Sequence, residues 1–172
     1  MATKKKKQAS KPSAATKKVQ PIPAGYPPIT PYLRVRSAQQ ALEFYKKAFG
    51  AQENSRMAGL DGRVMHAEMQ VFDTRVMLSD EFPERGALSP ESLKGSPVGL
   101  FVYTRDVDAA IARAVAAGAT VTMPAQDMFW GDRFGTIRDP FGHDWQLATH
   151  KEDVPPKEMH RRFQAMQAQQ KS

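Results

Sequence analysis

Hydrophobic positions change from strand-like to helix-like spacing early in the chain. Residues 29–36 alternate between apolar and polar, as a β-strand does, and residues 38–49 carry an apolar helical stripe. Ser37 is a good helix N-cap, and Gly50 is placed to end the helix. Further alternating stretches predict three strands, which complete a βαβββ unit: 52–57, 63–72 and 75–79.

The same order of elements returns after a polar connector at residues 81–97. A predicted strand at 98–104 is followed by a helix at 107–117, and then by four short strands: 120–123, 127–130, 134–138 and 143–149. Arg36 and Arg105 occupy corresponding positions 69 residues apart. Two copies of one unit indicate a pseudo-symmetric α+β fold, whose binding site we expect where the copies face each other.

The pattern divides the chain into a tail, one domain and a final helix. We expect the domain at 29–153, with its modules at about 29–80 and 98–150, after a tail and proline-rich lead-in at 1–28. The helix at 155–170 has an apolar stripe through Met159, Phe163 and Met166. Such a stripe predicts docking against another surface, with a homodimer as the simplest case.

Composition narrows the classes of function. The chain has 172 residues, 41% of them hydrophobic, and no cysteine, so disulfides, thiolate catalysis and zinc–thiolate sites are excluded. No apolar run approaches the roughly 20 residues that cross a bilayer, so we expect no membrane partner. The lack of cysteine fits a reducing compartment, and we expect a cytoplasmic protein.

The net charge of +7 comes entirely from the N-terminus. Residues 1–20 hold seven lysines and no acid, while the remainder holds 18 basic and 18 acidic residues. We therefore expect nucleic acid or another polyanion to make at most a weak contact with the tail, which we predict to be disordered. The balanced remainder argues against a nucleic-acid-binding domain.

Two motifs in the second unit give the chain its resemblance to a known family. It resembles the vicinal oxygen chelate superfamily, which includes glyoxalase I, bleomycin-resistance proteins and extradiol dioxygenases. The resemblance runs from about residue 29 to 153 and rests on these stretches: Trp130-Gly131-Asp132-Arg133-Phe134-Gly135, Asp139-Pro140-Phe141-Gly142-His143, and 43–50 in the first unit. It implies paired βαβββ modules that form a half-open, mixed β-sheet cup with the helices outside and a ligand site inside.

The resemblance also implies where a metal would bind. The family's four ligand positions correspond by motif to Thr30, Glu68, Gly99 and Gln146, and His66 could act as a replacement ligand. Two oxygen donors out of four positions do not meet the ligand count of a tight transition-metal site. We therefore expect no metal ligands and no cofactor, and keep a divalent metal as the weaker alternative.

Strand alternation, together with the resemblance, predicts the cup's lining. On residues 63–72 one face is apolar, whereas the other carries His66, Glu68 and Gln70. We expect aromatic walls, including Met128 and Phe134, and Glu68 as the catalytic base if there is catalysis. The expected ligand-binding residues are Thr30, Tyr32, His66, Glu68, Phe101, Tyr103, Trp130, Arg133 and Gln146.

Each polar residue of this set also has a structural interpretation. His66 could simply hydrogen-bond Glu68, and Glu68 could form an ion pair with Arg34. Arg133 could brace the turn at Asp139. Trp145 is expected in the core, while His143 and His150 are expected in a turn and on the surface.

Three functions remain open from the sequence. The favoured one is a small-molecule-binding protein of the glyoxalase or bleomycin-resistance type, which could be a lyase or isomerase acting on a small oxygenated substrate, or a dioxygenase relative. The second is a non-catalytic protein that sequesters a ligand. The third, an accessory protein that contacts polyanions, rests on the lysine-rich tail alone.

Overall fold

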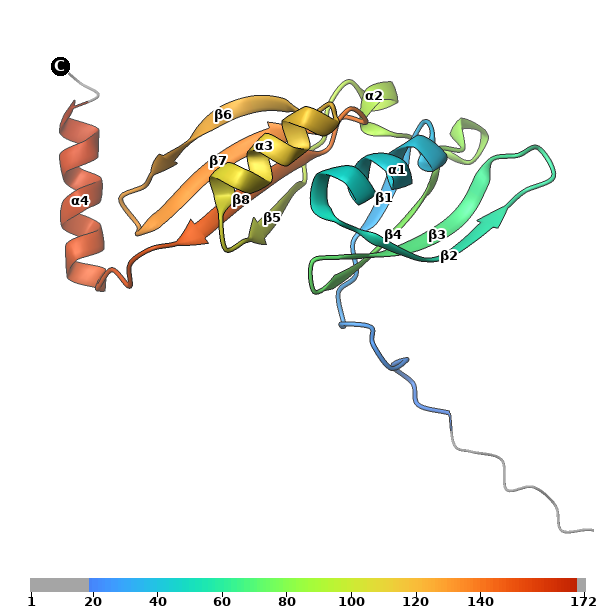
Figure 1. Ribbon diagram of the computed structural model, residues 1–172, viewed down its shortest axis with the longest axis horizontal. Coiled ribbons are helices and arrows are strands. Elements are labelled where there is room, and N and C mark those ends of the chain that lie inside the picture. Colours follow the sequence, from blue (N-terminus) through green and yellow to red (C-terminus); the bar gives the residue numbers. More distant parts are fainter. Residues whose placement is uncertain (1–18, 170–172) are drawn as a thin grey trace, which may run out of the picture.

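The computed structural model describes residues 19–169 and consists of two βαβββ modules joined by their helices (Figure 1). The lysines of the predicted tail lie outside the described residues. The first module contains β1 (Tyr32–Val35), α1 (Ala38–Phe49), β2 (Gln52–Ala58), β3 (Val64–Val71) and β4 (Thr74–Asp80). The second contains β5 (Gly99–Tyr103), α3 (Val107–Ala117), β6 (Thr120–Asp127), β7 (Asp132–Arg138) and β8 (Asp144–His150).

The two sheets have the same topology, which confirms the predicted α+β fold of paired modules. Their strand orders are β1-β4-β3-β2 and β5-β8-β7-β6, each with one parallel pair and two antiparallel pairs. Corresponding pairs have matching register, with Tyr32 opposite Met77 and Phe101 opposite Gln146. These pairs are offset by the same 69 residues as Arg36 and Arg105. The repeat in the sequence is therefore a repeat in three dimensions.

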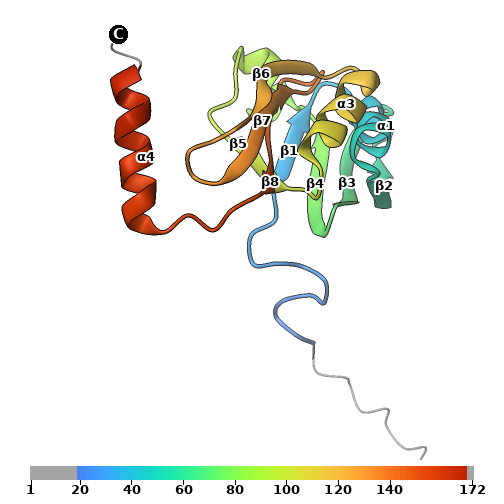
Figure 2. The same ribbon diagram turned by 60° about the vertical axis from the view of Figure 1, so that its left-hand side comes forward.

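Helices α1 and α3 pack against each other and cover one face of the sheets (Figures 1 and 2). The predicted apolar stripe of α1 is buried, including Leu42, Tyr45 and Phe49. Tyr45 on α1 connects the first module to the second. Its hydroxyl donates a 2.7 Å hydrogen bond to Asp139, and its ring packs against Trp145. Trp145 is 2% exposed, so its expected place in the core is confirmed.

Two predicted strands of the second module are in fact one strand and a turn. β6 runs unbroken from Thr120 to Asp127, and Met128–Gly131 forms the turn before β7, so the predicted strand at 127–130 is wrong. The strand continues through Pro124, because β6 is an edge strand with register shifts on either side of Met123. An edge strand with bulges accommodates a proline because no neighbour needs its missing N–H.

The connector between the modules contains two short helices that the sequence pattern missed: the 3₁₀ helix η1 (Pro83–Arg85) and α2 (Pro90–Leu93). Ser89 caps α2, and Pro90 occupies its first turn, a favoured start for a helix. The connector lies across the turn at residues 139–142, where a Cβ on Gly142 would come within 2.9 Å of Pro90.

The predicted C-terminal helix is present as α4 (Pro156–Gln169) and extends away from the modules (Figures 1 and 2). None of its residues is buried. The preceding segment crosses Gly131, whose carbonyl oxygen accepts hydrogen bonds from Lys151 and Glu152. A Cβ at Gly131 would lie 2.2 Å from the Glu152 oxygen, so this crossing requires glycine.

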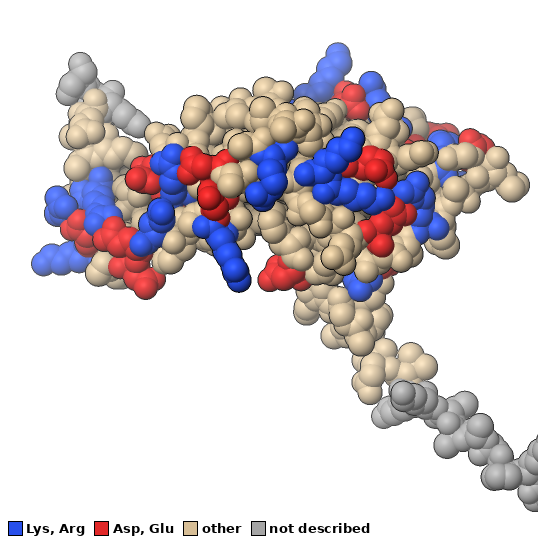
Figure 3. Space-filling model, viewed as in Figure 1, with Lys and Arg blue, Asp and Glu red and all other residues tan. Residues whose placement is uncertain are grey.

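No helix in residues 19–169 is long and apolar enough to cross a membrane. On the face that carries α1 and α3, acidic and basic side chains are interspersed (Figure 3). This distribution agrees with the balanced charge of the folded part and gives that face no single-sign patch.

Candidate functional site

Glu68 is the centre of a hydrogen-bond network on the face of the first sheet opposite α1. Its Oε2 atom accepts hydrogen bonds from the Tyr26 hydroxyl (2.7 Å) and the Arg75 guanidinium (2.6 Å). Its Oε1 atom lies 3.2 Å from Nε2 of His66. The Glu68 side chain is 13% exposed, so the carboxylate is largely enclosed by these three partners.

The network stabilises the ionised form of Glu68. The hydrogen bond from Tyr26 is the largest influence; with those from His66 and Arg75 and the positive charge of Arg75, it outweighs burial and lowers the pKa of Glu68 from 4.5 to about 2. The hydrogen bond to Glu68 is also the main reason why the pKa of Tyr26 is raised. A carboxylate with so low a pKa is a weak proton acceptor at neutral pH.

Arg75 and Tyr26 were missed by the sequence analysis, which considered Arg34 as the ion-pair partner of Glu68. That pairing is wrong: Arg34 donates to Ser79, directly opposite it on β4, and its guanidinium stacks on the Tyr32 ring. Arg75 shares the sheet face of Met77 and Ser79, so strand parity could have identified it. Tyr26 lies in the proline-rich lead-in and had no comparable signal.

Tyr32 extends the network of the first sheet. Its hydroxyl lies 3.1 Å from Nδ1 of His66, whose Nε2 faces Glu68. The imidazole therefore bridges a phenol and a carboxylate, and the tautomer decides which nitrogen donates. The expected group Tyr32, His66 and Glu68 is brought together on one surface.

Asp132 is the centre of a second network, on the corresponding face of the second sheet. It is 3% exposed, and its carboxylate accepts hydrogen bonds from the Trp130 indole (3.0 Å) and the Tyr103 hydroxyl (3.2 Å). His150 places Nδ1 2.7 Å from the same carboxylate. Tyr103 and Trp130 were expected from the sequence, whereas Asp132 was not, although it lies inside the motif Trp130-Gly131-Asp132-Arg133-Phe134-Gly135.

His150 is half-exposed but not a free surface residue. Its hydrogen bond with Asp132 is the main cause of a raised pKa, and Asp153, 3.0 Å from Nε2, adds to the effect. A buried carboxylate that holds one imidazole nitrogen is a common way to orient a histidine.

Aromatic rings line the second sheet beside Asp132. Phe101 stacks on Phe134 at 5.7 Å between ring centres, and Tyr103 and Trp130 contact the same pair. Phe101 is 47% exposed and Tyr103 is 61% exposed. The residues expected as aromatic walls therefore lie together, and their outer side is exposed in the single chain.

A cavity of about 470 Å³ lies between the β3–β4 turn and β5. Phe72 and Thr74 line it from the first module, and Phe101 and Tyr103 line it from the second. Its volume falls within the range of about 300–1,000 Å³ that is usual for small-molecule sites. The cavity is thus lined by both modules.

Arg133 does not join the cluster, so its expected place in the cup is wrong. It shares the helix-covered side of β7 with Gly135 and Ile137, and it forms a bidentate ion pair with Asp108 of α3 (2.6 and 2.8 Å). The cause is strand alternation, which places Phe134 on one face and Arg133 on the other. Bracing of the Asp139 turn by Arg133 is equally wrong.

Gln146 and Thr30 lie at the margins of the candidate site. Gln146 reaches across the sheet, and a Cβ added to Gly99 would come within 2.9 Å of its side-chain nitrogen. Thr30 precedes β1, and its hydroxyl donates to the backbone of Pro27. Within residues 19–169, no hydrogen bond or ion pair connects the Glu68 network with the Asp132 network.

The strand register shows that Glu68 and Gln146 do not occupy equivalent positions in the two modules, as the metal ligands suggested by the resemblance would. Gln146 lies opposite Phe101 and therefore corresponds to Met77, whereas Glu68 corresponds to Thr136. Both oxygens of Glu68 already have partners, one of them the cation of Arg75. No group of three or more His, Asp or Glu side chains in the described part could hold a metal ion. The residues do not fit such a site, because a ligand role for Glu68 would have to displace Arg75.

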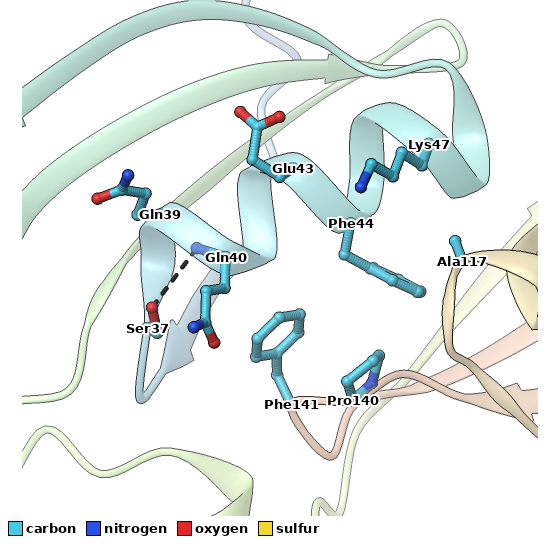
Figure 4. Close-up of a pocket in the computed structure, with 9 residues that line it drawn as sticks. All are labelled: Ser37, Gln39, Gln40, Glu43, Phe44, Lys47, Ala117, Pro140 and Phe141. Atoms are coloured by element: carbon cyan, nitrogen blue, oxygen red, sulfur yellow. Dashed lines mark hydrogen bonds between the residues drawn. The ribbon is translucent and has the colours of Figure 1, made fainter.

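A separate hollow of about 560 Å³ lies on the helix-covered side (Figure 4). The rings of Phe44 and Phe141 meet edge to face at its base, and polar side chains of α1, including Gln40 and Lys47, form its rim. None of the expected site residues lines this hollow. The candidate site is therefore on the opposite face of the sheets.

Comparison with known proteins agrees with the architecture. The sequence model of the Glyoxalase/Bleomycin resistance protein/Dioxygenase superfamily matches residues 26–147. An uncharacterised protein of Mycobacterium bovis is 42% identical over 131 residues, which cover 74% of this chain and 86% of that protein. The chain belongs to this superfamily.

Two solved structures show the same fold. The X-ray structure of a gene product from Arabidopsis thaliana has a TM-score of 0.57 and 29% identity, covering 72% of this chain and 98% of that chain. A glyoxalase/bleomycin resistance protein/dioxygenase from Nocardioides has a TM-score of 0.58 and 26% identity, covering 76% and 87% of the two chains.

Proposed function

We propose that this protein binds a small, partly aromatic or apolar molecule and holds it without proton transfer by Glu68. The observation that carries the proposal is the exposed aromatic cluster beside the 470 Å³ cavity between the modules. Exposed aromatic rings with a few fixed polar groups are typical of ligand sites. The binding residues would be Tyr32, His66, Phe101, Tyr103, Trp130 and Gln146.

The state of Glu68 favours binding over catalysis. A general base works best with a pKa near the operating pH, whereas the pKa of Glu68 is about 2. In this proposal Glu68 keeps Tyr26, His66 and Arg75 in place, so that His66 and Tyr32 present defined hydrogen-bonding groups. A lyase or isomerase would need another base, and His150 on Asp132 is the best placed candidate in the second sheet.

A homodimer is part of the proposal. The stripe of Met159, Phe163 and Met166 on α4 has one aromatic contact with the modules, between Phe163 and Phe129 at 5.3 Å. The aromatic cluster is also uncovered in the single chain. A second copy would cover both surfaces. We expect a dimer in sedimentation experiments, and a monomer when the chain is truncated after Asp153; a wild-type monomer would contradict this part.

Substitution of Phe101 tests the binding site. Native mass spectrometry of the full chain, purified without added ligands, should reveal a retained small molecule or identify one from a library of aromatic compounds. Phe101→Ala should weaken its binding at least tenfold, whereas Val121→Ala, an exposed change on the edge strand β6, should leave it unchanged. Equal binding by wild type and Phe101→Ala would refute the assignment.

Glu68→Gln separates a positioning role from a structural one. The amide keeps the size of the side chain but leaves Arg75 without its negative partner. If Glu68 positions the site, ligand binding falls while the fold persists. Normal binding with a lowered melting temperature would show that Glu68 only stabilises the sheet.

A further inference from the structure

A second cavity, of about 270 Å³, lies between the edge strands β1 and β5 and beneath connector residues 88–98. Its volume is just below the usual range for drug-sized ligands, so it suits a small molecule. Most of its lining is apolar, and the main contributors are Leu33, Leu88, Pro90, Leu93, Pro97 and Leu100.

His143 lines this cavity and is a buried group whose charged neighbour is Asp139. It was expected in an exposed turn, but its side chain is only 9% exposed, and its ring makes no hydrogen bond within residues 19–169. Nδ1 is fully buried and lies 3.7 Å from Oδ2 of Asp139, too far for a hydrogen bond. Native structures rarely leave such groups unpaired, so an unpaired buried imidazole points to a missing partner.

Asp139 is already saturated and cannot provide that partner by a small shift. Its Oδ2 accepts from the Tyr45 hydroxyl and the Trp145 indole, and its Oδ1 accepts from the backbone N–H groups of Phe141 and His143. The imidazole of His143 is thus fixed by its backbone beside a fully occupied carboxylate. Because His143 lines the cavity, its ring is in position to contact a molecule there.

Arg34 also lines the cavity and has no carboxylate partner in the described chain. Its guanidinium donates to the Ser79 hydroxyl at 2.5 Å and packs 4.3 Å above the Tyr32 ring. These neutral contacts orient the cation without neutralising it. A partly buried, uncompensated guanidinium is a suitable partner for an oxyanion.

We propose that this cavity binds a small organic acid with an apolar body. Arg34 supplies the charge for its carboxylate, His143 supplies a hydrogen bond, and the leucines and prolines enclose the apolar part. Tyr32, one of the binding residues proposed above, also lines this cavity, but the connector forms most of its walls and no ring of the aromatic cluster of the second sheet lines it.

Benzoate is a suitable probe, and benzamide is its neutral counterpart. In NMR titrations of the full ¹⁵N-labelled chain, benzoate should shift the amide signals of residues 88–98 and the ring signals of His143 in a saturable way. We expect a dissociation constant of about 1 mM, typical of so small a ligand. Benzamide should bind at least tenfold more weakly, since it lacks the charge that Arg34 recognises.

Two variants with matched controls locate the probe. Arg34→Gln should weaken benzoate binding at least tenfold, whereas Arg105→Gln, an exposed arginine outside the cavity, should not change it. Val98→Trp should fill the mouth of the cavity and abolish binding, whereas Val115→Trp, exposed on α3, should not. Thermal melts check that each variant is folded, and the His143 ring signals of the wild type report on the site without any substitution.

Several outcomes would overturn the proposal. These are a lack of saturable shifts at residues 88–98, equal affinity for benzoate and benzamide, or wild-type affinity in both Arg34→Gln and Val98→Trp. Loss of benzoate binding in Phe101→Ala but not in Val98→Trp would place the probe on the aromatic cluster instead. That result would refute this cavity while leaving the function proposed for the cluster intact.

Discussion

Asp80 and Thr149 occupy the same place in the two modules, and each accepts a hydrogen bond from the start of its module's helix. Asp80 Oδ1 receives the N–H of Ala38 at 2.6 Å, and Thr149 Oγ1 receives the N–H of Val107 at 2.9 Å. The last sheet strand of each module thus fixes the helix that follows its first strand. Asp80 also accepts from the backbone of Val64, so it joins three elements.

Replacement of Asp80 should therefore destabilise the protein more than replacement of Thr149. Asp80→Ala leaves the buried N–H groups of Ala38 and Val64 unpaired, at a cost of about 2–5 kcal/mol in the free energy of unfolding. Thr149→Ala leaves one such group and should cost about 1–2 kcal/mol. Urea denaturation measures both. Thr149 also donates a hydrogen bond to the backbone oxygen of Thr104, so similar losses in the two variants would show that the two bonds of Asp80 contribute no more than those of Thr149.

Arg75→Met should raise the pKa of Glu68 from about 2 toward its ordinary value. Carboxyl ¹³C NMR titration measures this shift directly. The pair is largely enclosed, with Arg75 18% and Glu68 13% exposed, so its loss should lower the free energy of unfolding at pH 7 more than the loss of an exposed pair does. Arg138→Met, which breaks an exposed pair with Asp144, is the control and should cost about 0–1 kcal/mol.

The same pair predicts a pH dependence at the acid end. The pKa of Glu68 is lower in the folded state than in the unfolded state, so its stabilising effect is present above pH 4.5 and is lost as the pH falls toward about 2. The melting temperature of wild type should fall more steeply over this window than that of Arg75→Met. Parallel curves would show that Arg75 contributes little to the low pKa of Glu68 and that the hydrogen bond from Tyr26 is sufficient for it.

His150 predicts a pH dependence of stability with the opposite sign near neutral pH. Its pKa is raised in the folded state, mainly by the hydrogen bond with Asp132, so its contribution to stability is present below about pH 6.5 and is lost as the pH rises through the folded pKa. Asp132→Asn should return the pKa of His150 toward 6.5 in a ¹H–¹⁵N NMR titration.

Metal analysis tests the mismatch between the residues and a metal site. Protein purified without chelator should carry well under one divalent metal per chain, because Arg75 holds the carboxylate of Glu68 and Gln146 lies in a different module. Elemental analysis by mass spectrometry gives the stoichiometry. A full equivalent of Zn, Ni, Mn or Fe would require Glu68 to release Arg75, and the loss of that metal in Glu68→Gln would confirm the change.

The candidate site was predictable where alternation decides the face of a strand. Tyr32, His66 and Glu68 were expected on one surface and lie there, as do Phe101 and Tyr103 in the second sheet. Arg133 was expected in the cup together with its neighbour Phe134, although adjacent residues of β7 (Asp132–Arg138) point to opposite faces of the sheet. A one-residue shift in a strand moves a side chain to the opposite face.

The sequence by itself determined the two modules, the buried stripe of α1, the caps of its helices and the absence of any cysteine chemistry, because these depend on local spacing and composition. Only the tertiary structure decided which side chains form hydrogen bonds and ion pairs with one another. Arg75 and Tyr26 donate hydrogen bonds to Glu68 from positions 7 and 42 residues away in the sequence. Asp132 forms hydrogen bonds with Tyr103 and His150, which lie on other strands of the second sheet. Charge, burial and pKa depend on such long-range neighbours, which chain folding brings together and which local periodicity does not encode.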